Sequence, residues 1–336
     1  MRATIKDVAK AASVSVATAS MALNNKKGVN EKTRKHVEEV AKRLNYMPNL
    51  SARSLVTNKS DCIGLIVPEI VNPYYSSIVD IMTKLTEKAG LTLLLGISNS
   101  KSRVEKEYLQ MFAIRQVLGV IIVPMLVDNP DTNHLEMLRA AKIPFVFCTE
   151  RYPNCKEAAV MCDFEQGEYE MVRYLLEKDI KDFCFLTIDY KTHFTTLRMK
   201  GLIKAFEEKG LEIDKNNLFY LNTPSFQDAY EITDQMLKRE PRAIVSINDI
   251  MAMGIIKRLS ELKIRVPEDI WVAGFDDMMF AALAQVPITT VKQPLWEICG
   301  KSMELLQEKI NNPHDKARED KIHFIPAELV IRETTG

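Results

Sequence analysis

Several polar and aromatic residues that can bind a small molecule follow short apolar runs of the chain. They are Tyr74, Tyr75, Arg198, Asn248 and Asp276. Tyrosine rings can stack on a sugar or a base, while Arg, Asn and Asp can bond hydroxyl groups or ring edges. Each also has a purely structural interpretation, because Asn248 can cap a helix and Tyr74 can belong to the core.

The sequence contains no pattern typical of an enzyme. The six cysteines include no Cys-x-x-Cys pair, and the five histidines have no metal-ligand spacing. Neither a phosphate-binding loop nor a nucleophile elbow is present. We therefore predict a protein that is not an enzyme and needs neither metal nor cofactor. Without a signal peptide or an apolar membrane span, we expect it to be cytoplasmic, with reduced thiols.

Short apolar runs alternate with amphipathic stretches over the last 276 or so residues, more than most single domains hold. The predicted strands are Cys62 to Val67, Leu91 to Ile97, Val120 to Val123, Phe145 to Cys148, Val160-Met161, Phe183 to Ile188, Ala243 to Ile247 and Trp271 to Phe275. The predicted helices include Tyr74 to Ala89, Phe164 to Lys178, Leu197 to Lys209 and Ile250 to Leu262. This alternation predicts an α/β fold with two lobes, each a parallel sheet covered by helices. Because ligands of such sheets bind beyond the carboxyl ends of the strands, a cleft between the lobes is the expected site.

The first 47 residues have a different pattern, which predicts three short helices. Thr4, followed by Asp7, is expected to begin the first helix as a capping box. Ser15 is expected to cap a second helix up to about Asn24, and Asn30 a third. Two short helices separated by a tight turn, with a third behind them, form the helix-turn-helix that places a helix end in the DNA major groove.

Charge is distributed unevenly along the chain. Residues 1–60 carry 12 Lys or Arg against 4 Asp or Glu, a net charge of +8. The whole chain has 45 of each, so the remainder carries a net charge of −8. A solvated surface would be the simple explanation, but the basic charge coincides with the three helices, which favours binding to phosphates.

Short motifs follow one another in order along the chain. They begin with Thr4-Ile5-Lys6-Asp7-Val8-Ala9, Val14-Ser15-Val16-Ala17-Thr18, Leu23-Asn24 and Ala52-Arg53-Ser54-Leu55. They continue through Ile63-Gly64-Leu65-Ile66-Val67-Pro68, Asn72-Pro73, Asn248-Asp249, Gly274-Phe275-Asp276-Asp277 and Glu328-Leu329-Val330. This ordered series covers nearly the whole chain and resembles the lactose-repressor (LacI) family of bacterial transcription regulators. It implies a helix-turn-helix head, a hinge helix and a bilobed core like that of periplasmic binding proteins.

The resemblance implies which residues contact DNA. Val16, Ala17 and Met21 match positions that read bases. The matches to positions that hold the phosphate backbone are Thr4, Thr18, Ser20, Asn24 and Asn30. Ser15 completes this candidate surface at the start of the second helix.

Met21 departs from the family pattern, which usually has Arg or another polar residue here. An arginine can bond guanine with two hydrogen bonds, whereas Met offers only apolar contact, chiefly to a thymine methyl group. Alternatively, Met21 only packs and its base is read weakly. Both interpretations predict an altered preference at one base of each half-site.

Residues 48–60 correspond to the hinge helix of the family. By resemblance, two copies fold side by side in the minor groove. Leu55 matches the wedge that enters the central base step, and Ala52 leaves room for the helix pair.

The resemblance also implies the effector contacts. Arg198, Asn248 and Asp276 match ligand-binding positions, and Tyr74 and Phe226 match walls of the pocket. Tyr75 is included as its neighbour. Two positions depart from the pattern. The acid after the fourth strand is Glu150, shifted by one residue, and Asp163-Phe164 stands where relatives often have Asp-Asn.

The sequence thus predicts a dimeric repressor that binds an operator with two-fold symmetry and responds to a sugar or sugar derivative. A nucleobase- or co-protein-dependent corepressor is the alternative, and a sugar-binding protein without a role on DNA is a weaker one, because it would not need the basic head. The predicted divisions are 1–47 for the head, 48–60 for the hinge, 61–162 plus about 292–323 for one lobe, and 163–291 plus about 324–336 for the other.

Overall fold

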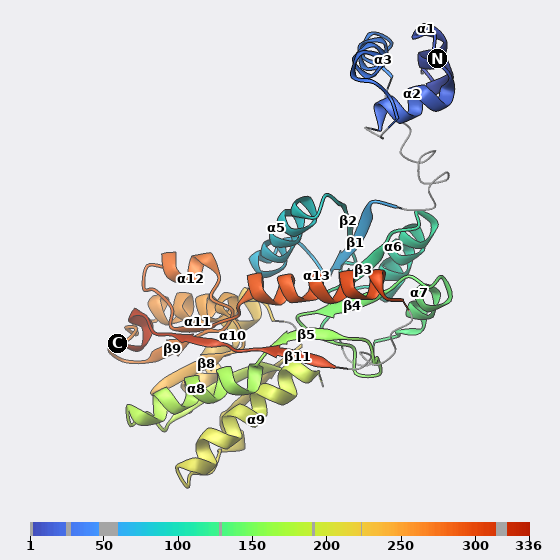
Figure 1. Ribbon diagram of the computed structural model, residues 1–336. Coiled ribbons are helices and arrows are strands. Elements are labelled where there is room, and N and C mark those ends of the chain that lie inside the picture. Colours follow the sequence, from blue (N-terminus) through green and yellow to red (C-terminus); the bar gives the residue numbers. More distant parts are fainter. Residues whose placement is uncertain are drawn as a thin grey trace. The chain divides into compact units, whose positions relative to one another are not determined.

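The structure of the protein is a computed structural model (Figure 1). It describes residues 3–24, 28–46, 60–127, 130–189, 192–222, 224–313 and 321–336. The chain divides into two compact units, Met1–Ser60 and Asp61–Gly336. Most of the predicted hinge, including Ala52 and Leu55, lies outside the described residues.

The first unit has the three predicted helices, and each begins at its predicted cap. The helices are α1 (Ile5–Ala11), α2 (Val16–Leu23) and α3 (Glu31–Arg43). Thr4 and Asp7 form a capping box, in which the Thr4 amide donates to Asp7 Oδ2 at 2.8 Å. The Ser15 hydroxyl accepts from the amide of Thr18 at 3.0 Å, and Asn30 Oδ1 accepts from that of Thr33 at 2.8 Å. These bonds satisfy amides that have no partner within the helix.

Small apolar side chains hold these helices together. The buried set is Val8, Ala9, Ala12, Ala19, Ala22, Val37, Val40 and Ala41. Because five of these eight are alanines, the helices approach each other closely but bury little area. Between α1 and α2, Ser13 takes a positive φ of 54°, which makes the tight turn.

Two parallel sheets form the framework of the second unit (Figure 1). The first has six strands in the order β11-β5-β4-β3-β1-β2. Its strands are β1 (Cys62–Val67), β2 (Thr92–Ile97), β3 (Gly119–Ile122), β4 (Phe145–Cys148), β5 (Ala159–Cys162) and β11 (Ile322–Ile325). The second has the order β7-β6-β8-β9. Its strands are β6 (Phe183–Ile188), β7 (Leu218–Leu221), β8 (Ala243–Ser246) and β9 (Trp271–Ala273).

The chain passes between the sheets more than once. After β9, the short strand β10 (Thr290–Lys292) pairs antiparallel with β12 (Glu328–Val330). Between these two strands, β11 returns to the first sheet and pairs with β5. The first sheet is therefore not contiguous in sequence, whereas the second consists of the successive strands β6 to β9. The lobe boundaries stay a prediction.

Helices lie between the strands. They are α5 (Pro73–Lys88), α6 (Ser102–Ile114), α7 (Glu136–Ala140), α8 (Phe164–Glu177), α9 (His193–Glu208), α10 (Phe226–Leu237), α11 (Asp249–Glu261), α12 (Met279–Leu283) and α13 (Leu295–Asn311). Short 3₁₀ turns occupy Asn133–Leu135, Lys215–Asn217 and Glu333–Thr335. Within the described part of the chain, no helix has the length and apolar character to cross a membrane.

The predicted elements are confirmed where the apolar pattern is long. Cys62–Val67, Phe145–Cys148 and Phe183–Ile188 are strands with the predicted bounds, and α9 begins four residues before the predicted start at Leu197. The sequence did not indicate β7, β10, β11 or β12, which have three or four residues each and are mostly only part-buried, so their apolar pattern is weak.

Helices α8 and α9 lie side by side, at the bottom of Figure 1, because a glycine lets their backbones approach. Gly201 of α9 faces α8 so closely that a Cβ there would overlap the carbonyl oxygen of Glu165. The same Cβ would lie 2.9 Å from the amide nitrogen of Tyr169. Both obstacles are backbone atoms, which cannot move without shifting a helix.

We expect Gly201→Ala to destabilise the second unit by about 1–3 kcal/mol, as overpacking of a tight interface does. Gly300→Ala is the matched control, because Gly300 also lies within a helix but has no atom within 4 Å of the added Cβ. The control should be neutral, or stabilising by up to about 1 kcal/mol, since Ala favours helix more than Gly. Urea denaturation measures both, and equal effects of the two changes would contradict the packing argument.

Candidate functional site

A cavity of about 70 Å³ lies where the carboxyl ends of both sheets meet. Its lining comes from the segments that follow the strands: Asn72, Tyr74, Tyr75, Pro124, Leu126, Thr149, Glu150, Phe164, Ile188, Phe194, Pro224, Ile247, Asn248, Asp276 and Gln293. Five of the seven predicted effector residues are in this set. This is the position at which open α/β sheets bind ligands.

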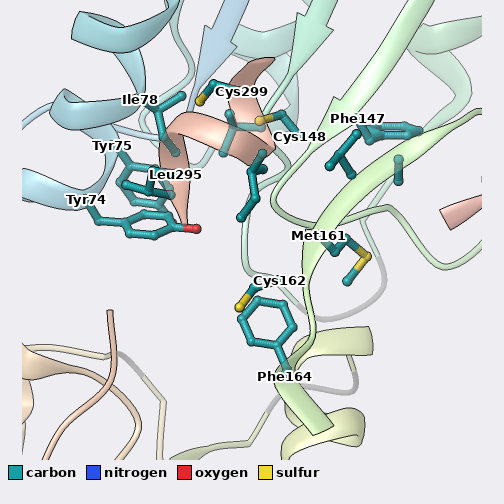
Figure 2. Close-up of a cluster of buried hydrophobic side chains, with 14 of the residues drawn as sticks. Tyr74, Tyr75, Ile78, Phe147, Cys148, Met161, Cys162, Phe164, Leu295 and Cys299 are labelled. Atoms are coloured by element: carbon teal, nitrogen blue, oxygen red, sulfur yellow. The ribbon is translucent and has the colours of Figure 1, made fainter. Parts of the chain in front are cut away.

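Aromatic rings form two walls of the cavity. Asn72 Oδ1 caps α5 by accepting from the amide of Tyr74 at 3.0 Å, which places Tyr74 and Tyr75 in the first turn. Their rings meet edge to face, with centroids 5.3 Å apart. Phe164 and Phe194 meet in the same way at 5.0 Å. Figure 2 shows the two tyrosines beside Leu295 and Phe164 beyond the end of β5, so the aromatic rings come from segments far apart in the sequence.

A chain of hydrogen bonds crosses from α5 to the segment after β9. The Tyr74 hydroxyl donates to Gln293 Oε1 at 3.0 Å, and Gln293 Nε2 donates to Asp276 Oδ1 at 2.7 Å. Gln293 lies between β10 and α13, where the chain returns to the first sheet. The sequence pattern does not predict the role of Gln293, because its position depends on β10, a strand of three residues that is too short to give an apolar pattern.

Asp276 occupies an unusual backbone position and has an unusual acidity. Its φ of 108° is in the left-handed region, and its amide donates to the carbonyl of Val291 at 2.8 Å. Burial raises the pKa of Asp276 to about 7, although the bond from Gln293 and the charge of Arg198 act in the opposite direction. The neighbouring Asp277 instead pairs with Arg332 at 2.6 Å, so the two adjacent carboxylates have different partners.

Glu150 reaches across the cavity to the start of α9. Its Oε2 accepts from the amide of Phe194 at 2.9 Å, and its Oε1 accepts from the amide of Arg151 at 2.8 Å. His193 Nδ1 lies 3.2 Å from Glu150 Oε1. The bond with Glu150 raises the pKa of His193 above its ordinary value, against the effect of burial. The acid is thus satisfied by a helix N-terminus, where negative charge is favoured.

Asn248 caps a helix and also lies at the cavity. Its side-chain oxygen caps α11 by accepting from the amide of Met251 at 2.8 Å. The same residue lines the cavity. The capping interpretation and the binding interpretation are therefore compatible, since an amide has further hydrogen-bonding capacity.

Arg198 and Phe226 do not line the cavity. The guanidinium of Arg198 is buried behind it, with 2% of the residue exposed, and forms an ion pair with Glu168. Phe226 begins α10 and is 38% exposed, in a separate surface depression beside Met253 and Ile256. The helix begins directly after Ser225, so Pro224 takes the place at the cavity expected for Phe226.

In the head, the residues predicted to read bases lie at and after the start of α2. Val16 and Ala17 are exposed, Val16 to 44%. Met21 is half-buried, and its methyl group lies so close to Gly28 that a Cβ there would be 2.9 Å from it. Met21 therefore packs against the segment at Gly28, while its contact with a base stays a prediction. Asn24 Nδ2 donates to the carbonyl of Ser20 at 2.8 Å.

The chain matches two family patterns. Residues 4–49 match the family described as bacterial regulatory proteins, lacI family, and residues 172–335 match a periplasmic binding protein-like domain.

Similar proteins extend over the whole chain. It is 30% identical to the HTH-type transcriptional regulator DegA of Bacillus subtilis, over 100% of this chain and 99% of that protein. It is 32% identical to the regulator RegA of Clostridium saccharobutylicum, over 100% of both. Among solved structures, the Lac repressor dimer bound to operator and the anti-inducer ONPF has a TM-score of 0.88 at 25% identity, covering 100% of this chain and 99% of that one. The CelR–cellobiose complex has a TM-score of 0.72 at 24% identity, covering 99% and 100%. With a head and a core that both match, and with relatives of this identity along its full length, the chain belongs to the LacI family of bacterial transcription regulators.

Proposed function

We propose that the protein is a cytoplasmic, dimeric repressor whose operator affinity is controlled by a small molecule bound in the cavity between the lobes. The observation that carries this proposal is the pair of side-chain bridges across the cavity. One runs from Tyr74 through Gln293 to Asp276, and the other from Glu150 to the start of α9. A ligand that enters must replace these bonds, which changes the relation of the lobes.

The cavity is suited to a sugar or a sugar derivative. Flat faces of Tyr75 and Phe164 can stack on a ring, while Glu150 and Asp276 can accept bonds from hydroxyl groups. Asn248 offers both donors and acceptors. One structural relative is a complex with cellobiose. A nucleobase is the second candidate, since the same faces can stack on a base.

In this proposal the head binds DNA through two kinds of contact. Val16, Ala17 and Met21 contact base edges, and the phosphate contacts come from Thr4, Ser15, Thr18, Ser20, Asn24 and Asn30. Thr4, Ser15 and Asn30 cap helices with their side chains, so their helix N-termini face the phosphates with free amides. Ala52 and Leu55 are assigned to the minor groove from the family resemblance alone.

Coupling between the two sites requires only a modest free energy. Linkage between ligand and DNA is typically about 1–3 kcal/mol and acts in both directions. The Lac repressor relative is a dimer on its operator. A symmetric dimer presents two heads, so the operator should have two-fold symmetry.

Deletion of residues 1–60 tests whether the head binds the DNA and the core binds the effector. We expect the remaining core to lose binding to an operator selected from random duplexes, and to keep the thermal shift caused by any sugar, sugar phosphate or nucleobase that stabilises the full chain. Fluorescence anisotropy and thermal unfolding measure the two properties. Operator binding by the shortened chain, or a selected site without inverted symmetry, would contradict the proposal.

Met21→Arg should change which operator is selected. A guanidinium at this position can bond guanine with two hydrogen bonds, which is worth about 1–3 kcal/mol of discrimination. We therefore expect selection to enrich guanine at one base of each half-site. Ala11→Arg adds the same charge on α1, outside α2, and should strengthen binding to all duplexes without a new preference. An unchanged consensus for Met21→Arg would refute the assigned orientation of α2.

Asp276→Asn should alter the pH dependence of stability. The pKa of Asp276 is about 7 in the folded protein, compared with about 4 when unfolded, so its contribution is complete below pH 4 and is lost as the pH rises to 7. The loss amounts to roughly 4 kcal/mol, at 1.4 kcal/mol per pH unit. In the variant, urea denaturation between pH 4 and 7 should have a correspondingly smaller slope.

Two comparisons complete this test. Buried Asp249 also has a raised pKa, and it leaves a residual slope in the variant. The control Asp80→Asn changes an exposed carboxylate on α5 and should keep the wild-type slope. Identical pH profiles for wild type and Asp276→Asn would show that folding does not raise the pKa of Asp276.

A further inference from the structure

We propose that Glu168 neutralises Arg198 inside the protein, so that the cavity selects a ligand with hydrogen-bond donors and without an anionic group. The inference rests on the proposed function of the cavity and specifies the class of its ligand. It excludes sugar phosphates and nucleotides as effectors. Neutral polyols and amino compounds share the required donors.

The pair is fully enclosed between α8 and α9. Glu168 is inaccessible to solvent, and its Oε2 lies 2.6 Å from Arg198 Nε and 2.5 Å from Nη2. Arg198 Nη1 donates to the carbonyl of Ile247 at 2.5 Å. The face of the guanidinium lies over the ring of Phe275, with Cζ 4.1 Å from the centroid. Every nitrogen of Arg198 therefore already has an acceptor.

An anionic ligand cannot use Arg198 without removing Glu168 from it. That exchange would leave a carboxylate buried without its counter-charge, which is strongly unfavourable. The position of Arg198 also argues against contact, since Arg198 is not among the lining residues, whereas Ile247, whose carbonyl it bonds, is one of them. Arg198 is accordingly a positioning residue for the end of β8 and for Phe275.

The charges that remain at the cavity are negative. Among its described lining residues, Glu150 and Asp276 are the ionisable carboxylates, and none is Lys or Arg. His193 is beside the cavity, but it is held against Glu150. Both carboxyl groups can accept bonds from hydroxyl or ammonium groups. Glu150, and Asp276 to the extent that it is ionised near its pKa of about 7, also repel an anion.

The second oxygen of Glu168 makes a clean test possible. Glu168 Oε1 is buried and has no hydrogen-bond partner. In Glu168→Gln the amide oxygen can keep the bonds to Arg198, while the amide nitrogen takes the place of Oε1 and disrupts no existing bond. The substitution removes one charge and keeps the shape.

The experiment measures the thermal unfolding of the full chain with inorganic phosphate, against sodium chloride at equal ionic strength. The wild type should show no saturable stabilisation by phosphate. Glu168→Gln should gain it, with apparent affinity higher by roughly tenfold or more, the effect expected of one unneutralised charge a few ångströms away. Glu165→Gln, one turn earlier on α8, removes the same charge at a part-exposed position and should behave as wild type. The double variant with Glu168→Gln and Arg198→Gln should lose the gain.

The results test the role of Glu168 and the exclusion of anions separately. Equal responses of Glu168→Gln and Glu165→Gln would overturn the role of Glu168. A phosphate response of the wild type that disappears in Arg198→Gln would overturn the exclusion of anions. The thermal unfolding of the wild type with glucose, glucosamine or glucose 6-phosphate does not depend on the folding of any variant. Stabilisation by the phosphate ester alone refutes the proposal. Stabilisation by glucose or by glucosamine supports it and distinguishes hydroxyl from ammonium donors.

Discussion

The direction of the strands is the constraint on which the candidate site depends. Every pair within the two larger sheets is parallel. The segments that follow the ten strands of those sheets therefore all lie at the carboxyl edges of the sheets. The cavity lies where the two edges face each other. Residues as distant in sequence as Tyr74 and Gln293 therefore become hydrogen-bonding neighbours. Parallel pairing, more than any single motif, brings the binding chemistry together.

The small size of the cavity then determines how its polar groups behave. Buried donors and acceptors need partners, and few water molecules fit in this space. The groups bond to each other across the cavity, which makes Gln293 a bridge and gives Glu150 a helix N-terminus as its partner. The same burial raises the pKa of Asp276 to about 7. In the proposed function, ligand recognition and the relative position of the lobes therefore depend on the same bonds.

Local signals in the sequence were sufficient for the caps and the long strands. Thr4 and Ser15 cap the expected helices, because capping depends on residues only three positions apart. The arrangement around Arg198 could not be predicted in this way. Its partner Glu168 lies 30 residues away on another helix, and the bond depends on how closely Gly201 lets the helices approach. The structure places Phe226 outside the cavity for a related reason. The residue at which α10 begins decides whether Pro224 or the phenylalanine ring faces the cavity.

The head and the core divide affinity and control between them. The net charge of +8 over residues 1–60 gives attraction to any duplex and makes binding depend on salt. Val16, Ala17 and Met21 are apolar, so base reading adds little to that attraction beyond contact with thymine methyl groups. Under the proposed assignment of the base-reading residues, specific binding exceeds non-specific binding by a narrow margin. Under this condition, a coupling free energy of about 1–3 kcal/mol between ligand and DNA is sufficient. It changes the affinity for the operator several-fold to about a hundredfold. Because the proposed head has only a small preference for its operator, a small coupling free energy between the effector site and the DNA is enough to control operator binding.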